Sequence, residues 1–205
     1  MKLKEPVVKV CEISAFDAPE KYEKAYSSLC AGRRERVDSY RKEDDKKRAL
    51  AASVLLQDCL SESGVSVFSI VYGENGKPYL KDRCDIFFSL SHSGDYAVCA
   101  IYDREVGVDV EKISGASEKL IRKVTADSEF DFLMSLDKSA CNEEFARLWT
   151  AKESYVKRDG SGFLIPPTEL SVDLSDVLSI SRDGKRENVS FREIPIPGYK
   201  LTVCY

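Results

Sequence analysis

Two carboxylates separated by one residue are the first candidate for chemistry in this chain of 205 residues. They are Asp109 and Glu111, in the segment Gly-Val-Asp-Val-Glu. Successive side chains on a strand alternate between its faces, so both carboxylates would point one way and the valines into the core. Such a pair repels unless a cation lies between its members, and Mg²⁺ prefers oxygen ligands of this kind. The segment is equally typical of a solvated strand face whose charges pair with neighbours such as Lys112.

A second candidate is the segment Trp-Thr-Ala-Lys-Glu-Ser-Tyr-Val-Lys, which begins at Trp149. Helical geometry places Trp149, Glu153 and Lys157 on one stripe, one turn apart. Glu153 could complete a cation site with the two strand carboxylates, and Lys157 could hold a phosphate or move a proton beside it. The alternative is an exposed Glu-Lys pair, worth about 0.3–0.5 kcal/mol, with the tryptophan in the core.

Groups that could hold an anion lie elsewhere in the chain. The segment Phe-Ser-Leu-Ser-His-Ser-Gly-Asp from Phe88 contains Ser91 and the chain's one histidine, His92, and hydroxyl, imidazole and backbone N–H groups can all donate to a phosphate. Lys77 lies between a glycine and a proline, which can hold it in position. An ordinary turn and an ordinary loop are the alternatives for these two segments.

Composition excludes several classes of function. Thirty-one Lys and Arg against 35 Asp and Glu give a net charge of -4, which argues against a nucleic-acid binder. A single histidine excludes a zinc site built on several histidines. The seven cysteines show no C-x-x-C spacing and are odd in number, which favours reduced thiols over a disulfide framework. No signal peptide and no apolar stretch of membrane-spanning length is visible, so we expect a cytoplasmic protein without a membrane partner.

The hydrophobic patterns predict an α+β chain in which helices and strands alternate in blocks. A strand and the first helices are predicted at 7–13, 19–29 and 33–60, with a possible interruption at 41–48. Strands are then predicted at 65–71, 86–90, 97–102 and 106–111, with a loop at 73–85. The last two strands are expected to form a hairpin that turns at 103–105. Helices at 120–124, 130–136 and 143–157 precede strands at 170–174, 177–182, 189–194 and 199–204.

The order of the motifs is more specific than any one of them. Gly-Lys-Pro at 76–78, the Ser-His segment, Gly-Val-Asp-Val-Glu and the Trp-to-Lys segment follow one another as in 4′-phosphopantetheinyl transferases of the surfactin-synthetase-activating type, which the chain closely resembles. The resemblance implies an α+β fold of two similar subdomains related by a pseudo-twofold axis, with the active site in the cleft between them. The N-terminal half, residues 1–104, would bind the 3′-phosphoadenosine of coenzyme A. The C-terminal half, residues 105–205, would hold the magnesium site and the catalytic helix.

The resemblance also implies roles for individual residues. Asp109, Glu111 and Glu153 match magnesium ligands. Glu153, directly or through water, would accept the proton of the attacking serine, and Lys157 would stabilise the leaving oxygen or assist proton transfer. Neither Asp109 nor Glu153 is expected in the hydrophobic core. The residues that match coenzyme A contacts are Arg33, Arg48, Lys77, Pro78, Ser91, His92 and Lys157.

The implied reaction transfers 4′-phosphopantetheine from coenzyme A to a serine of an apo acyl, peptidyl or aryl carrier protein, with Mg²⁺ as cofactor and 3′,5′-ADP as the second product. We expect a monomer whose carrier protein docks between Ser114 and Cys141. Two alternatives remain: a Mg²⁺-dependent pyrophosphate hydrolase, and a non-catalytic module that binds coenzyme A or a carrier protein.

Overall fold

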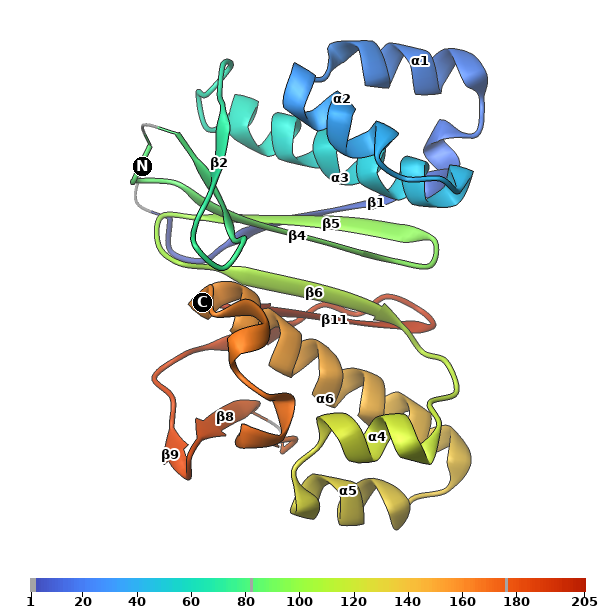
Figure 1. Cartoon of the computed structure of the whole chain (residues 1–205), viewed down its shortest axis with the longest axis vertical. Helices are drawn as coiled ribbons and strands as arrows, with labels where there is room; N and C mark the ends of the chain where they lie inside the picture. Colours follow the sequence, from blue (N-terminus) through green and yellow to red (C-terminus); the bar gives the residue numbers. More distant parts are fainter. Residues whose placement is uncertain (1–2, 82, 176) are drawn as a thin grey trace.

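Two antiparallel sheets meet in the middle of the molecule (Figure 1). The computed structural model describes residues 3–81, 83–175 and 177–205. The first sheet has the strand order β1-β5-β4 and the second has the order β10-β11-β6. Their strands are β1 (Val7–Glu12), β4 (Phe87–Ser93), β5 (Tyr96–Tyr102), β6 (Gly107–Lys112), β10 (Phe191–Glu193) and β11 (Tyr199–Cys204).

Helices cover the outer faces of both sheets, so the predicted α+β class is confirmed. One long helix packs on each sheet, α3 on the first and α6 on the second, so that the two halves repeat one arrangement (Figure 1). Within the described residues, each helix is too short or too polar to cross a membrane. The helices are α1 (Pro19–Ser28), α2 (Ala31–Asp38), α3 (Glu43–Glu62), α4 (Glu118–Val124), α5 (Asp127–Met134) and α6 (Lys138–Asp159).

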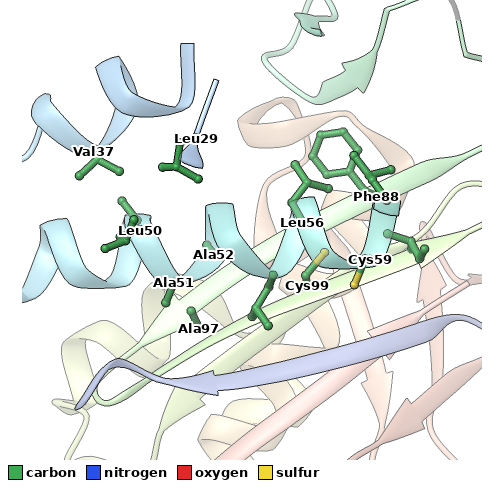
Figure 2. Close-up of a cluster of buried hydrophobic side chains, with 14 of the residues drawn as sticks. Leu29, Val37, Leu50, Ala51, Ala52, Leu56, Cys59, Phe88, Ala97 and Cys99 are labelled. Atoms are coloured by element: carbon green, nitrogen blue, oxygen red, sulfur yellow. The ribbon is translucent and has the colours of Figure 1, made fainter. Parts of the chain in front are cut away.

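The core of the N-terminal half lies between α3 and the first sheet. Helix α3 begins with three acidic residues, which suit the positive end of the helix dipole. Its apolar side chains Leu50 and Leu56 are fully buried, and Figure 2 shows Leu56 beside Phe88 of the sheet and Leu50 toward Val37 of α2. Burial of this apolar surface fixes the helix against β4 and β5.

Helix α6 is defined at both ends by capping groups. The carboxylate of Asp137 accepts hydrogen bonds from the backbone N–H groups of Ser139 and Ala140, at 2.9 and 3.0 Å. At the other end Gly160 adopts a φ of 79°, a left-handed conformation that glycine reaches without strain. The helix therefore spans 22 residues and carries both Glu153 and Lys157.

A third apolar cluster lies between the two sheets. It contains Val98 and Ala100 of β5, Val108 and Val110 of β6, and Leu201 of β11, all of them buried. The valines of Gly-Val-Asp-Val-Glu thus face the core, as predicted. This cluster holds the two halves together and sets the position of β6 beneath β4 and β5 (Figure 1).

The predicted hairpin between 97–102 and 106–111 is wrong. Strand β5 pairs with β1 on one side and with β4 on the other, so both of its edges are occupied. Residues 103–105 instead carry the chain to the second sheet, where β6 pairs with β11. The hairpin is formed by β4 and β5, which turn at Gly94 with a φ of 54°.

The remaining differences from the predicted elements are local. The helical stretch predicted at 33–60 is interrupted, as its charged segment at 41–48 indicated, but the break between α2 and α3 lies at residues 39–42. The strand predicted at 65–71 is reduced to β2 (Ile70–Tyr72), which pairs with β3 (Pro78–Leu80) inside the predicted loop. A small sheet of β7 (Leu170–Asp173), β8 (Ser179–Arg182) and β9 (Lys185–Arg186) lies in the C-terminal half.

Candidate active site

The three carboxylates singled out in the sequence line one cleft. Asp109 and Glu111 project from β6, and Glu153 projects from α6, which packs on that strand. Asp109 is only 3% exposed, although it lines the cleft and is not part of the apolar core clusters. It is buried because β6 is covered by β4 on one side and by α6 on another.

Gly107 allows α6 to approach β6 this closely. A Cβ atom at position 107 would lie 1.9 Å from the backbone oxygen of Ser154 and 2.5 Å from the backbone nitrogen of Arg158. These are backbone atoms, which cannot rotate away as a side chain would. Glycine at this position therefore lets the helix bring Glu153 and Lys157 over the strand carboxylates.

Lys157 is the cationic partner of Asp109. Its Nζ lies 2.6 Å from Oδ1 of Asp109 and 3.0 Å from Oγ of Ser91, while Ser91 donates to the same Oδ1 at 2.7 Å. The other carboxylate oxygen, Oδ2, is buried and has no hydrogen-bond partner among the described residues. An unpaired buried carboxylate oxygen is costly, which indicates that a further cationic group belongs there.

Charge is concentrated around this oxygen. Burial raises the pKa of Glu153, and repulsion by Asp109 raises it further. Burial followed by repulsion from Asp109 also raises the pKa of Glu111, although the hydrogen bond from Ser93 opposes the shift. The charge of Asp109 thus disfavours ionisation of Glu111 and Glu153 unless positive charge is added.

This set of groups fits a hard divalent cation. All three side chains offer oxygen, the donor that Mg²⁺ prefers, and Oδ2 of Asp109 lacks a partner. In the described part of the chain, however, no three His, Cys, Asp or Glu side chains are already arranged to hold a metal ion. The ammonium group of Lys157 supplies the positive charge beside Asp109 in this arrangement.

The cleft itself has a volume of about 670 Å³ and a lining that carries both signs of charge. Arg33 and Arg36 of α2 line it together with Tyr40. The Arg36 guanidinium lies 5.1 Å from the centre of the Tyr40 ring. The edge of that ring meets His92, with 6.3 Å between the ring centres. The cleft thus offers cations and aromatic surface together with a carboxylate cluster.

A smaller, mostly apolar pocket of about 370 Å³ opens beside this cleft. Trp149, Glu153 and Lys157 line both, so the carboxylate cluster lies where the two meet. Leu90 and Pro78 also belong to both linings. The site can therefore accommodate a molecule with a charged part and a longer, less polar part.

Comparisons with known proteins agree across the chain. The family model described as "4'-phosphopantetheinyl transferase superfamily" matches residues 105–204, and the model "4'-phosphopantetheinyl transferase, N-terminal" matches residues 17–103. The 4'-phosphopantetheinyl transferase gsp of Aneurinibacillus migulanus is 32% identical over 78% of this chain and 69% of its own. The chain belongs to the 4′-phosphopantetheinyl transferase superfamily.

Two further relatives extend this similarity. The 4'-phosphopantetheinyl transferase Sfp of Bacillus subtilis (strain 168) is 29% identical over 90% of this chain and 85% of its own. The 4'-phosphopantetheinyl transferase AcpT of Escherichia coli (strain K12) is 35% identical over 66% of this chain and 68% of its own. The resemblance to the surfactin-synthetase-activating type is confirmed, and the chain is a transferase of this family.

Within this transferase, the basic residues expected to contact coenzyme A differ in their surroundings. Arg33 lines the cleft and donates to Oγ of Ser53 at 2.9 Å, and burial lowers the pKa of its guanidinium. Arg48 instead donates to the backbone oxygen of Gly94 at 2.7 Å and to Asp45 at 2.5 Å. In the described structure Arg48 is outside the lining of the cleft, and its contact with coenzyme A remains a prediction.

Lys77 is held between the two halves of the transferase. Its ammonium group donates to Glu105 and, at 2.6 Å, to the backbone oxygen of Arg158 at the end of α6. Burial lowers the pKa of Lys77, and the bond to Glu105 opposes this shift. Lys77 and Pro78 line the apolar pocket, so their predicted contact with coenzyme A would be on that side.

Ser91 and His92 point to opposite faces of β4, as neighbours on a strand do. Ser91 faces β6 and is engaged by Asp109 and Lys157, whereas His92 faces Tyr40. Burial lowers the pKa of His92, and nearby Lys157 and Arg48 lower it further, which favours a neutral imidazole. Both residues line the cleft, and their predicted roles in binding remain untested.

The sequence motifs did not reveal every residue of the cleft. Tyr40 and Tyr72 line it, yet each lies in a segment with no recognisable spacing, one between two helices and one on a short strand. Ser93, whose hydroxyl donates to Glu111 at 2.7 Å, was visible in the Ser-His segment but received no role. Ser93 follows Ser91 by two residues and therefore lies on the same face of β4. This spacing was the sequence signal that could have identified it.

Proposed function

We propose that this transferase moves 4′-phosphopantetheine from coenzyme A to a serine hydroxyl of an apo acyl, peptidyl or aryl carrier protein and releases 3′,5′-ADP. The observation that carries the proposal is the cleft, which the carboxylates of β6 and α6 line together with Arg33 and Arg36 of α2. A pyrophosphate with an attached adenosine phosphate matches this distribution of charge, and the adjoining apolar pocket suits the pantetheine arm.

In this proposal the two halves divide the substrate. Residues 1–104 bind the 3′-phosphoadenosine through Arg33, Arg48, His92 and Ser91, and Lys77 and Pro78 contribute the wall beside the arm. Residues 105–205 supply Asp109, Glu111 and Glu153, which would hold Mg²⁺. When bound there, Mg²⁺ would add positive charge next to the pyrophosphate oxygens.

The chain's own groups then carry the proton and the charge. The hydroxyl oxygen of the carrier serine forms a bond to the pantetheine-side phosphorus. Glu153, directly or through a water molecule, accepts the proton of that hydroxyl. Lys157 stabilises the oxygen that leaves with 3′,5′-ADP as the phosphorus–oxygen bond breaks. His92 binds and does not act as a base.

The carrier protein would approach over the surface between Ser114 and Cys141. Leu120 and Phe132 are exposed there, at 46% and 44%, whereas Phe130 is buried. A pocket of about 230 Å³ lined by Leu120, Trp149 and Glu111 lies directly beside the carboxylates. We place the reaction in the cytoplasm and assign it to a monomer, without a nucleic-acid or membrane partner.

The test is the intact mass of a panel of apo carrier proteins after incubation with the enzyme, coenzyme A and Mg²⁺. At least one carrier should gain the mass of one phosphopantetheine. Asp109→Asn should abolish the gain, and Asp17→Asn, at a side chain 63% exposed and outside both the cleft lining and the proposed docking surface, should not. Release of 3′,5′-ADP without any carrier would instead indicate a pyrophosphate hydrolase, and binding of coenzyme A without turnover a non-catalytic module.

A further inference from the structure

Three serines of β4 form an unusual seam with β6. The two strands belong to different sheets and share no backbone ladder. Instead, serine hydroxyls accept hydrogen bonds from backbone N–H groups on the free edge of β6. The pairs are Ser89 with Val108 at 3.0 Å, Ser91 with Val110 at 3.3 Å, and Ser93 with Lys112 at 3.2 Å.

A serine hydroxyl can donate one hydrogen bond while it accepts others, and two of the three serines donate theirs to a carboxylate. Ser91 donates to Oδ1 of Asp109, and Ser93 donates to Oε2 of Glu111, each at 2.7 Å. In the described structure the hydroxyl of Ser89 makes no bond to a carboxylate. The seam therefore fastens both strand carboxylates of the C-terminal half to the N-terminal half.

Glu111 accepts a hydrogen bond from Ser93 at 2.7 Å and is also hydrogen-bonded by Trp149. Asp109 is also held by Lys157 and is almost fully buried, whereas Glu111 is half-buried and longer by one rotatable bond. Repulsion between the two carboxylates, which lie on one face of β6, would turn Glu111 outward. The bond from Ser93 holds it beside Asp109.

We infer that Ser93 is a positioning residue, which fixes Glu111 in the orientation that binds the divalent cation. The inference rests on the proposed function. Ser93 is absent from the residues of the described cleft lining, so it acts through Glu111 and not on the substrate. Loss of an outer partner of a metal-binding carboxylate typically weakens metal affinity by about 10- to 100-fold.

The experiment measures Mn²⁺ binding by electron paramagnetic resonance, with coenzyme A present, in the wild type and three variants. Ser93→Ala removes the hydroxyl, and Ser93→Thr keeps it. Ser89→Ala is the matched control, because it also removes an acceptor for a β6 N–H group but leaves both carboxylate bonds intact. The Mg²⁺ concentration for half-maximal transfer and the kcat at saturating Mg²⁺ are measured in parallel, with thermal unfolding to confirm folding.

We expect Ser93→Ala to weaken Mn²⁺ binding by about 10- to 100-fold, and to raise the Mg²⁺ requirement similarly. The kcat of Ser93→Ala should largely recover at saturating Mg²⁺. The variants Ser93→Thr and Ser89→Ala should bind Mn²⁺ with the affinity of the wild type. Equal weakening in both alanine variants would overturn the inference, because a purely structural seam predicts that result. Unchanged Mn²⁺ affinity in Ser93→Ala, with an active wild type, would overturn it as well. A wild type that modifies no carrier would instead reject the proposed function.

Discussion

The Nζ of Lys157 on α6 lies 2.6 Å from Oδ1 of Asp109 on β6, and it shares this oxygen with the hydroxyl of Ser91 from the other half of the chain. One ammonium group thus ties the catalytic helix to the strand carboxylate and to β4. Because the second oxygen of Asp109 has no partner among the described residues, this arrangement only partly neutralises the cluster. Loss of this ammonium group would therefore affect the stability of the fold as well as the proposed reaction.

Lys157→Gln should lower both stability and activity. The substitution leaves a buried carboxylate without its cation, which should reduce the free energy of unfolding by about 1–3 kcal/mol. Loss of the group that assists the leaving oxygen should reduce kcat by about 10²-fold or more. Urea unfolding and steady-state kinetics measure the two effects. The control is Lys200→Gln, whose ammonium pairs with the half-exposed Glu143; a similar loss of stability there would argue against a special role for the buried pair.

Glu153→Gln should remove activity while stabilising the metal-free protein. The folded-state pKa of Glu153 is raised above its unfolded value near 4.5, so the ionised group costs stability once the pH rises through the folded value. The variant should therefore unfold at a higher temperature than the wild type at neutral pH in EDTA. This difference should shrink as the pH falls from the folded-state pKa to 4.5 and disappear at lower pH, where the wild-type carboxyl is protonated in both states.

The matched control for Glu153→Gln is Glu144→Gln, on the same helix but paired with Arg147 outside the cleft. It should show neither the pH-dependent gain in melting temperature nor the loss of kcat, which for Glu153→Gln we expect to be about 10²- to 10⁴-fold. A variant Glu153→Gln that is less stable than the wild type at neutral pH would refute the electrostatic argument.

Sequence patterns predicted the site better than they predicted the sheet topology. The motif residues Asp109, Glu111 and Glu153 converge because alternation on β6 and periodicity on α6 are local properties of the chain. The pairing of β6 with β11 links residues about 90 positions apart, and no local pattern specifies it. Helix α3 begins at Glu43, inside the charged segment at 41–48. The sequence did not reveal this start, because acidic residues in a first turn resemble an exposed helix face.

The contacts made by buried polar residues were also beyond the sequence. Lys77 could be identified as a constrained lysine, but its partners Glu105 and Arg158 are far away in the chain and belong to the other half. Ser93 is likewise defined by its contact with Glu111 across the seam. Cytoplasmic location, the monomeric state and the individual roles of the coenzyme A contacts stay predictions.

Gly107→Ala should destabilise the protein strongly. The added Cβ would overlap the backbone of α6 at Ser154, and relief requires movement of the whole helix. We expect a loss of about 3 kcal/mol or more, at the upper end of overpacking effects. The control is Gly115→Ala, where no atom lies within 4 Å of the new Cβ; urea unfolding should separate the two variants. Equal, small effects would contradict the close approach of α6 to β6.

Glu129→Gln should also lower the free energy of unfolding, because it breaks a buried ion pair in the C-terminal half. Lys152, 1% exposed, donates to Glu129 at 2.5 Å, and Glu129 additionally accepts from the backbone N–H groups of Ala126 and Val172. Loss of one charge from such a buried pair costs about 3–5 kcal/mol. The free energy of unfolding measures this. Glu143→Gln, which breaks an exposed pair with Lys200, should cost at most about 1 kcal/mol. Comparable losses in the free energy of unfolding in the two variants would contradict the structural role of the buried pair of Glu129 and Lys152.

The most direct test of the central claim, that the carboxylate cleft transfers phosphopantetheine to a carrier protein, is the stoichiometry of the two products. The enzyme is mixed with coenzyme A, Mg²⁺ and apo carrier, and 3′,5′-ADP and modified carrier are quantified together. We predict equal amounts of both products, no 3′,5′-ADP without carrier, and loss of both in Asp109→Asn. Release of 3′,5′-ADP at an undiminished rate without carrier, or full carrier modification by Asp109→Asn, would contradict the claim.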